Sequence, residues 1–287
     1  MRGVGRLVLC VRMVSVLAGT TASAAASPVQ AATPPPQMVQ IPAGVFKASV
    51  SLSSESAATK DKKESDEVRI SSFFIDRLPV TNAEFLSFVK KNPRWQRDRA
   101  PRLLVDSEYL GHWQTPTELG KTALAEQPVS NVGWFAARAY CAARGGRLPT
   151  EAEWEYVASA SETQADARQD EGWRKRILDW YATPTPKALA KVGHSSPNFY
   201  GVFDLHGLIW EWVLDFSSTM MSGDSRDSGG SDRMLFCGAA AIGSGTKQDY
   251  ASFMRYAFRS SLQARYSSRN LGFRCAADLA PTIEVKP

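Results

Sequence analysis

Near the middle of the chain, apolar residues recur at helical spacing directly after a capping motif. Thr150 is followed three residues later by Glu153, so the two side chains can form a capping box at a helix start. Trp154, Val157 and Ala158 then repeat at the spacing that places side chains on one helix face. This pattern predicts a helix that begins after Thr150 and buries that face.

Similar signals predict two further helices. Thr81 and Glu84 repeat the capping box and precede an apolar face formed by Phe85, Phe88 and Val89. Ser130 or Asn131 can cap a third helix, which we expect to end at Gly145 because glycine favours helix C-termini. The buried face of that helix would comprise Trp134, Ala137, Tyr140 and Cys141.

Strand patterns are short and lie near the N-terminus. Residues 38–46 alternate and contain turn residues, which predicts a strand and a turn, and residues 68–75 are typical of one strand. Residues 49–66, 161–191 and 215–232 are rich in polar residues and predict loops. Together these patterns predict an α+β fold with little regular secondary structure.

The first 31 residues have the composition of an export signal. Arg2 and Arg6 precede an apolar run, and small residues with candidate cleavage sites follow it. Arg12 interrupts the run, so translation could also start at Met13. We therefore expect a periplasmic or secreted protein, and no other segment reaches the roughly 20 apolar residues that a membrane span needs.

Charge and composition exclude some classes of function. The chain has 287 residues, of which 44% are hydrophobic, and this suits one large or two small globular domains. Removal of residues 1–31 would take away three arginines and no acidic residue, so the net charge of +5 falls to +2. A nearly neutral chain argues against a nucleic-acid binder or a membrane-surface protein.

Three sequence motifs stand in order along the chain. They are Arg-Leu-Pro-Thr-Glu-Ala-Glu-Trp-Glu at residues 147–155, Asn-Phe-Tyr-Gly-Val-Phe-Asp-Leu-His-Gly at residues 198–207 leading into Trp-Glu-Trp, and Asn-Leu-Gly-Phe-Arg-Cys at residues 270–275. They resemble the motifs of the formylglycine-generating enzyme family, the sulfatase-modifying factor domain. Weaker matches at residues 38–46 and 79–82 extend the resemblance to nearly the whole chain after the export signal.

The resemblance implies a single α+β domain of the C-type-lectin-like type with many loops. We place this domain at residues 38–280, after the signal peptide at 1–31 and a flexible Pro-rich lead-in at 32–37. Residues 281–287 would form a C-terminal tail.

The resemblance also implies a disulfide between Cys141 and Cys275, which export would permit. In the chain-entropy model a bridge that closes a loop of over a hundred residues is worth roughly 4 to 5 kcal/mol. Cys237 is then the odd thiol. It is a candidate catalytic residue, but it could also form a dimer disulfide, bind a metal or be buried and inert.

Copper-dependent members of the family bind copper(I) through two cysteines five residues apart, just before an Arg-Tyr pair. Alignment of that pair with Arg255 and Tyr256 places Gln248 and Phe253 at the cysteine positions, and neither residue can supply a thiolate. The sequence therefore argues against copper. It also argues against iron, because the iron-dependent branch needs clustered histidines and this chain has three widely spaced ones: His112, His194 and His206. An iron site built from His112, His194 and one carboxylate stays open.

Calcium is the metal that the resemblance favours. Family members hold a structural calcium through groups that match the Asp204 and Glu211 side chains and the backbone oxygens of Gly207 and Ile209. Leu208 replaces a frequent asparagine in this loop. The alternative is that the two carboxylates cap turns or pair with arginines.

The segment that follows the copper-site positions is dense in arginine and tyrosine. Guanidinium groups bind carboxylates and peptide carbonyls in a forked geometry, so this segment could line the groove where the family binds an extended peptide. The candidate substrate-binding residues are Arg255, Tyr256 and Arg259. Alternatively, Arg255 and Arg274 form structural ion pairs with Glu153 or Glu155.

Two functions remain open at this point. The first is an exported maturation or accessory factor that binds a peptide or partner protein, such as a copper nitrite reductase, and resembles family branches without the copper cysteines. The second is a modifying oxidoreductase, based on a non-haem metal or a thiol, that acts on an exported protein or a siderophore-type peptide. A domain that only oligomerises is a third, plainer alternative.

Overall fold

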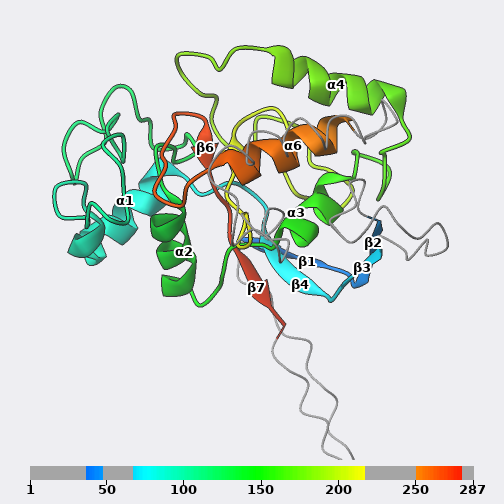
Figure 1. Ribbon diagram of the computed structural model, residues 1–287, viewed down its shortest axis with the longest axis horizontal. Helices are drawn as coiled ribbons and strands as arrows, with labels where there is room; N and C mark the ends of the chain where they lie inside the picture. The colour runs from blue at the N-terminus through cyan, green and yellow to red at the C-terminus, as the bar shows by residue number, and fades with distance from the viewer. Residues whose placement is uncertain (1–36, 48–66, 217–249, 280–287) are drawn as a thin grey trace, which may run out of the picture. The chain divides into compact units, whose positions relative to one another are not determined.

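The computed structural model describes residues 37–47, 67–216 and 250–279, which form a mixed α+β arrangement with many loops (Figure 1). The helices are α1 (Asn82–Lys91), the 3-10 helix η1 (Pro93–Trp95), α2 (Trp134–Ala143), α3 (Glu151–Ala158), α4 (Glu171–Ala182) and α6 (Tyr250–Ser261). The strands are β1 (Met38–Ile41), β2 (Gly44–Lys47), β3 (Glu67–Ile70), β4 (Phe73–Asp76), β5 (Trp210–Glu211), β6 (Leu271–Gly272) and β7 (Ala276–Asp278). The predicted fold class is confirmed.

Short strands from both ends of the domain meet in one sheet. β4 is its central strand and pairs antiparallel with β1 on one side and with β7 on the other. β2 pairs with β3, and β5 pairs with β6 in parallel. The prediction of one strand over residues 68–75 was wrong in part, because the chain turns at Ser71 and Ser72 and places β3 and β4 in different sheets.

The two capping boxes are present as predicted. Thr150 Oγ1 accepts a hydrogen bond from the Glu153 backbone N–H, and the Glu153 carboxylate accepts one from the Thr150 backbone N–H at 2.8 Å. Thr81 and Glu84 form the same reciprocal pair at the start of α1. Local sequence alone therefore determined where both helices begin.

The start of α2 differs from the prediction, because Gly133 is the N-cap and not Ser130 or Asn131. Asn131 adopts a positive φ of 52° and donates its backbone N–H to the Ser268 carbonyl, so a long-range contact engages it. A Cβ on Gly133 would lie 3.1 Å from the Ala264 carbonyl oxygen, which explains the glycine. As expected, the helix ends just before Gly145, whose φ is 76°.

Helix α4 lies within residues 161–191, which the sequence predicted to be loop-rich. The Asp170 side chain caps this helix by accepting from the Trp173 N–H at 2.9 Å, and Trp173 and Ile177 are its buried residues. These two positions are one turn apart, so α4 buries only a narrow stripe. The loops predicted at 49–66 and over most of 215–232 fall outside the described residues.

The main core is aromatic where α1 meets α2. The ring of Phe85 lies 5.7 Å from that of Tyr140 and 6.0 Å from that of Phe273, and all three side chains are buried. In the described part of the chain, every helix is too short or too polar to cross a membrane.

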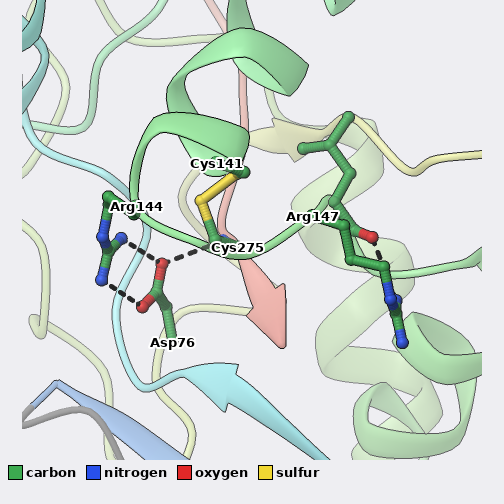
Figure 2. Close-up of a disulfide and its surroundings, with 6 residues drawn as sticks. Asp76, Cys141, Arg144, Arg147 and Cys275 are labelled. Atoms are coloured by element: carbon green, nitrogen blue, oxygen red, sulfur yellow. Dashed lines mark hydrogen bonds and ion pairs between the residues drawn. A yellow bond between two sulfur atoms is a disulfide. The ribbon is translucent and has the colours of Figure 1, made fainter. Parts of the chain in front are cut away.

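The predicted disulfide between Cys141 and Cys275 is confirmed, with a Cα–Cα distance of 5.5 Å (Figure 2). It joins α2 to the residue just before β7. Beside it, Asp76 accepts two hydrogen bonds from the Arg144 guanidinium, at 2.8 and 3.0 Å, and one from the Cys275 backbone N–H at 2.9 Å. The disulfide and the Asp76 carboxylate therefore hold β4, α2 and the C-terminal strand together.

Removal of the disulfide should cost the protein a large share of its stability. We expect the double variant C141A/C275A to unfold with a free energy about 4 kcal/mol below that of the oxidised protein, because the bridge spans 134 residues. Urea unfolding monitored by tryptophan fluorescence measures the difference. Wild-type protein unfolded under a reducing agent is the control and should match the double variant. Equal stability of the oxidised protein and the variant would contradict this account.

Candidate functional site

Helices α3 and α6 meet through buried charges. Glu155 of α3 accepts hydrogen bonds from Arg255 Nε at 2.7 Å, from Arg255 Nη2 at 2.6 Å and from Arg259 Nη1 at 2.9 Å. The two arginines are one turn apart on α6, so both reach the same carboxylate. All three side chains are at most 4% exposed. One glutamate therefore connects α3 to two successive turns of α6.

A second carboxylate, Glu151, lies one turn earlier on α3 and contacts Arg259 Nη1 at 3.2 Å. Burial raises the pKa of Glu151 to about 7, and the nearby Arg259 charge only partly offsets this. Burial would also raise the pKa of Glu155, but Arg255 and Arg259 outweigh it and lower the pKa to about 2. The two glutamates therefore titrate in different pH ranges.

Helix α4 covers the other side of α6, so that α6 lies between α3 and α4 (Figure 1). Trp173 and Ile177 of α4 pack in one small apolar cluster with Ala251 of α6. Tyr181 accepts a hydrogen bond from Arg255 Nη1 at 2.8 Å through its hydroxyl. Arg255 is therefore held by α3 and α4 together.

Beside this contact lies an aromatic cluster of four half-buried side chains: Trp180, Tyr181, Trp210 and Phe258. The Tyr181 ring stacks on Trp210 at 5.0 Å between centroids, with 18° between the planes. The Phe258 ring lies 4.4 Å and the Trp180 ring 5.6 Å from the ring of Trp210. The cluster keeps part of its apolar surface in contact with solvent.

The three predicted substrate-binding residues are all buried: Arg255 is 3%, Tyr256 4% and Arg259 2% exposed. Arg255 forms the structural ion pair with Glu155 that the sequence left as the alternative. The guanidinium of Arg259 also lies 4.4 Å from the Trp154 ring. Substrate binding by these residues stays a prediction.

The predicted calcium ligands make protein contacts of their own. Glu211 accepts from Arg274 Nε and Nη2, each at 2.8 Å, and from Trp154 Nε1 at 2.7 Å. Asp204 accepts from the Ser195 N–H at 3.1 Å and hydroxyl at 2.7 Å, from the Gly193 N–H, and lies 2.9 Å from His194 Nδ1. A cation on Glu211 would have to displace the Arg274 fork, because the two charges repel. The calcium site, with the carbonyls of Gly207 and Ile209, stays a prediction.

The histidines have separate environments. His206 lies 2.9 Å from the Ala158 carbonyl through Nε2, and burial together with the Arg255 charge lowers its pKa to about 3. Burial and the Arg97 charge lower the pKa of His112 to about 4. Among the residues that the structure describes, no three His, Cys, Asp or Glu side chains are grouped so that they could hold a metal.

Most of the residues that would carry thiol or copper chemistry lie outside the described part of the chain. Cys237 and Gln248 fall in residues 217–249, outside the described part. Phe253 belongs to α6. The sequence did not single out Tyr181 and Ser252 as site residues, although both hydrogen-bond to Arg255. No local motif marks them, because their contacts depend on how α4 meets α6.

Neutralisation of Glu155 should destabilise the protein strongly. We expect Glu155→Gln to lower the free energy of unfolding by about 3 to 5 kcal/mol, because it leaves two buried guanidinium groups without their shared counter-charge. The matched control is Asp179→Asn, which removes an exposed ion pair with Lys175 and should change stability by less than about 0.5 kcal/mol. Chemical denaturation measures both, and equal effects would contradict a structural role for Glu155.

The raised pKa of Glu151 gives a test that depends on pH. The protonated carboxyl stabilises the fold below its unfolded pKa of 4.5, and this contribution is lost as the pH rises through about 7. The Glu151→Gln variant lacks this loss, so it should gain stability relative to the wild type by up to about 3 kcal/mol between pH 4.5 and 8. The contribution of Glu155 is nearly constant above about pH 5.5, because it is lost only as the pH falls from the unfolded pKa of 4.5 to the folded pKa of about 2. Parallel pH profiles of the two proteins would contradict the prediction.

Comparison with known proteins places this arrangement in a family. The family model described as the sulfatase-modifying factor enzyme 1-like domain (FGE-sulfatase) matches residues 23–279. The formylglycine-generating enzyme of Streptomyces coelicolor is 32% identical, over 90% of this chain and 96% of its own. The inactive C-alpha-formylglycine-generating enzyme 2 of Mus musculus is 28% identical, over 84% of this chain and 86% of its own. The solved structure of PvdO from Pseudomonas aeruginosa covers 84% of this chain and 94% of its own, with 19% identity and a TM-score of 0.47. The chain therefore belongs to the sulfatase-modifying factor family, whose members include the formylglycine-generating enzymes.

Proposed function

We propose that this protein is an exported maturation or accessory factor that binds a peptide or a partner protein and does not form formylglycine with copper. The observation that carries the proposal is the pair of residues at the copper-site positions, Gln248 and Phe253. Copper(I) in the copper-dependent members needs two thiolates there, and an amide and a phenyl ring cannot replace them.

The described structure supports the proposal, because α6 is held in an ordered scaffold. Glu155 connects α3 to α6 through Arg255 and Arg259, and α4 covers α6. In the described part of the chain the only cysteines are Cys141 and Cys275, which bond to each other. A protein that keeps a binding scaffold and changes its metal-binding residues is expected to bind without catalysing the original reaction.

The family accommodates both outcomes. The relative from Streptomyces coelicolor is a formylglycine-generating enzyme by name, and the relative from Mus musculus is an inactive one by name. Family membership therefore does not decide between an enzyme and a binding protein, and the residues at positions 248 and 253 support the binding protein.

The aromatic cluster is the surface that we assign to the partner. Trp180, Tyr181, Trp210 and Phe258 are half-buried and present apolar faces beside α6. Aromatic side chains of this kind contribute strongly to protein and peptide interfaces, because they bury a large area with little loss of conformational freedom. The partner would be an exported peptide or a protein such as a copper nitrite reductase.

A comparison of a deletion strain with its parent tests the proposal. Intact-protein and peptide mass spectrometry of the periplasmic proteins and secreted small molecules should show an exported metalloprotein that is lost or lacks its metal, with no change in covalent mass. Loss of a defined covalent modification, such as a two-hydrogen oxidation, would contradict the proposal and favour the modifying oxidoreductase.

Complementation of the deletion strain with variants shows whether the aromatic cluster or the Cys237 thiol is needed for function. We expect Trp180→Ala to reduce recovery of the partner, because it removes part of the aromatic cluster. Leu103→Ala is the matched control, since Leu103 is an 83% exposed apolar residue outside the cluster. Cys237→Ser should restore the phenotype fully; if it fails while Trp180→Ala succeeds, the thiol and not the aromatic cluster is the functional group.

A further inference from the structure

A cavity of about 660 Å³ is lined by residues outside α3 and α6. Residues from the end of β4, the start of α1 and the end of α2 line it, together with Gly193 and Phe203 from the loop before β5. Its volume falls within the range of small-molecule sites in proteins. None of the candidate site residues named from the sequence lines it.

One part of the cavity wall is apolar. Leu78, Pro79, Val80 and Phe203 contribute to it. Leu78 is 37% exposed, although Pro79 and Val80 directly after it are buried. An apolar group of a ligand would therefore displace water from this wall, and that displacement is favourable.

Arg77 provides the charged group that is not already neutralised. It forms no ion pair with a carboxylate among the described residues, and its Nε donates only a 3.3 Å hydrogen bond to the Gly201 carbonyl. The other charged groups of the lining already have partners. Asp76 pairs with Arg144, and the Glu84 carboxylate accepts a hydrogen bond from the Thr81 N–H in the capping box. The remaining donors of the Arg77 guanidinium can thus bind an anion.

The position of Arg77 is fixed before any ligand arrives. Its guanidinium lies 5.6 Å from the Phe203 ring centroid. Its backbone N–H donates to the Gln37 carbonyl at 3.0 Å, and its carbonyl accepts from the Phe203 N–H at 2.8 Å and from Arg274 Nη1 at 3.3 Å. Arg274 is fully buried and paired with Glu211, so Arg77 is attached to the core of the domain. A preorganised group loses little entropy on binding.

We propose that this cavity binds a carboxylate that carries an apolar group, with the carboxylate on the Arg77 fork and the apolar group against Leu78 and Phe203. A free acylated amino acid and the C-terminal residue of a peptide share this chemistry. The lining of this cavity contains no residue of the aromatic cluster and neither copper-site position. A test of this site is therefore separate from a test of the proposed function.

Ligand-observed NMR titration of the full-length protein tests the site with four probes. They are N-acetyl-L-leucine, its amide, a short peptide ending in leucine with a free C-terminus, and the same peptide with an amidated C-terminus. We expect saturable binding of the free carboxylates and binding at least about tenfold weaker for the amides. Binding of the peptide but not of N-acetyl-L-leucine would identify a peptide C-terminus as the ligand, and binding of both would identify the carboxylate itself.

Arg77→Met assigns the binding to this residue, because methionine keeps the apolar stem and removes the charge. We expect it to weaken carboxylate binding about tenfold or more. The thermal unfolding midpoint should change little, because the Arg77 side chain makes only one 3.3 Å hydrogen bond and one ring contact, while its backbone makes the contacts with the core. Arg138→Met is the matched control: Arg138 is also exposed and lies 5.3 Å from a Trp134 ring, but it does not line the cavity. Equal binding by wild type and Arg77→Met, equal binding of acids and amides, or no saturable binding up to about 10 mM would each overturn the proposal.

Discussion

The contact of Glu155 with Arg255 and Arg259 constrains the arrangement of all the elements around the candidate site. An unpaired charge inside a protein is strongly unfavourable, so α3 and α6 are stable only where the one carboxylate meets both guanidinium groups. Tyr181 extends the same contact to α4. The contact therefore ties α3, α4 and α6 together.

The parts of the fold that the sequence predicted are those that depend on neighbouring residues. The capping boxes at Thr81 and Thr150 need only groups three residues apart, and both formed as expected. The cap of α2 was predicted two or three residues too early, because the Ser268 carbonyl engages Asn131 from far along the chain. Helix α4 was missed because its apolar stripe is narrow, and it becomes stable only against Ala251 of α6.

The ion pairs at the site also depend on contacts between residues far apart in the sequence. The sequence offers pairing of Arg255 and Arg274 with Glu153 or Glu155 as one alternative, and Arg255 does pair with Glu155. Glu153 is not available, because it closes the capping box and binds Arg147. Arg274 instead meets Glu211, 63 residues away. The residue types indicate ion pairs, but the packing of the helices and strands determines which carboxylate meets which arginine.

The buried charges pair with one another, and this pairing limits how the protein could recognise a ligand. Arg255 and Arg259 are buried and held by glutamates, so binding through them would require a ligand to compete with a buried carboxylate. Among the exposed or half-buried groups, the aromatic faces of the cluster around Trp210 and the guanidinium of Arg77 do not meet this competition, because no carboxylate of the described residues pairs with them. A ligand of the aromatic cluster would need a complementary apolar surface, and a ligand of Arg77 would need an anionic group. A binding protein can use both surfaces at once, because the aromatic cluster and Arg77 belong to different elements of the same domain.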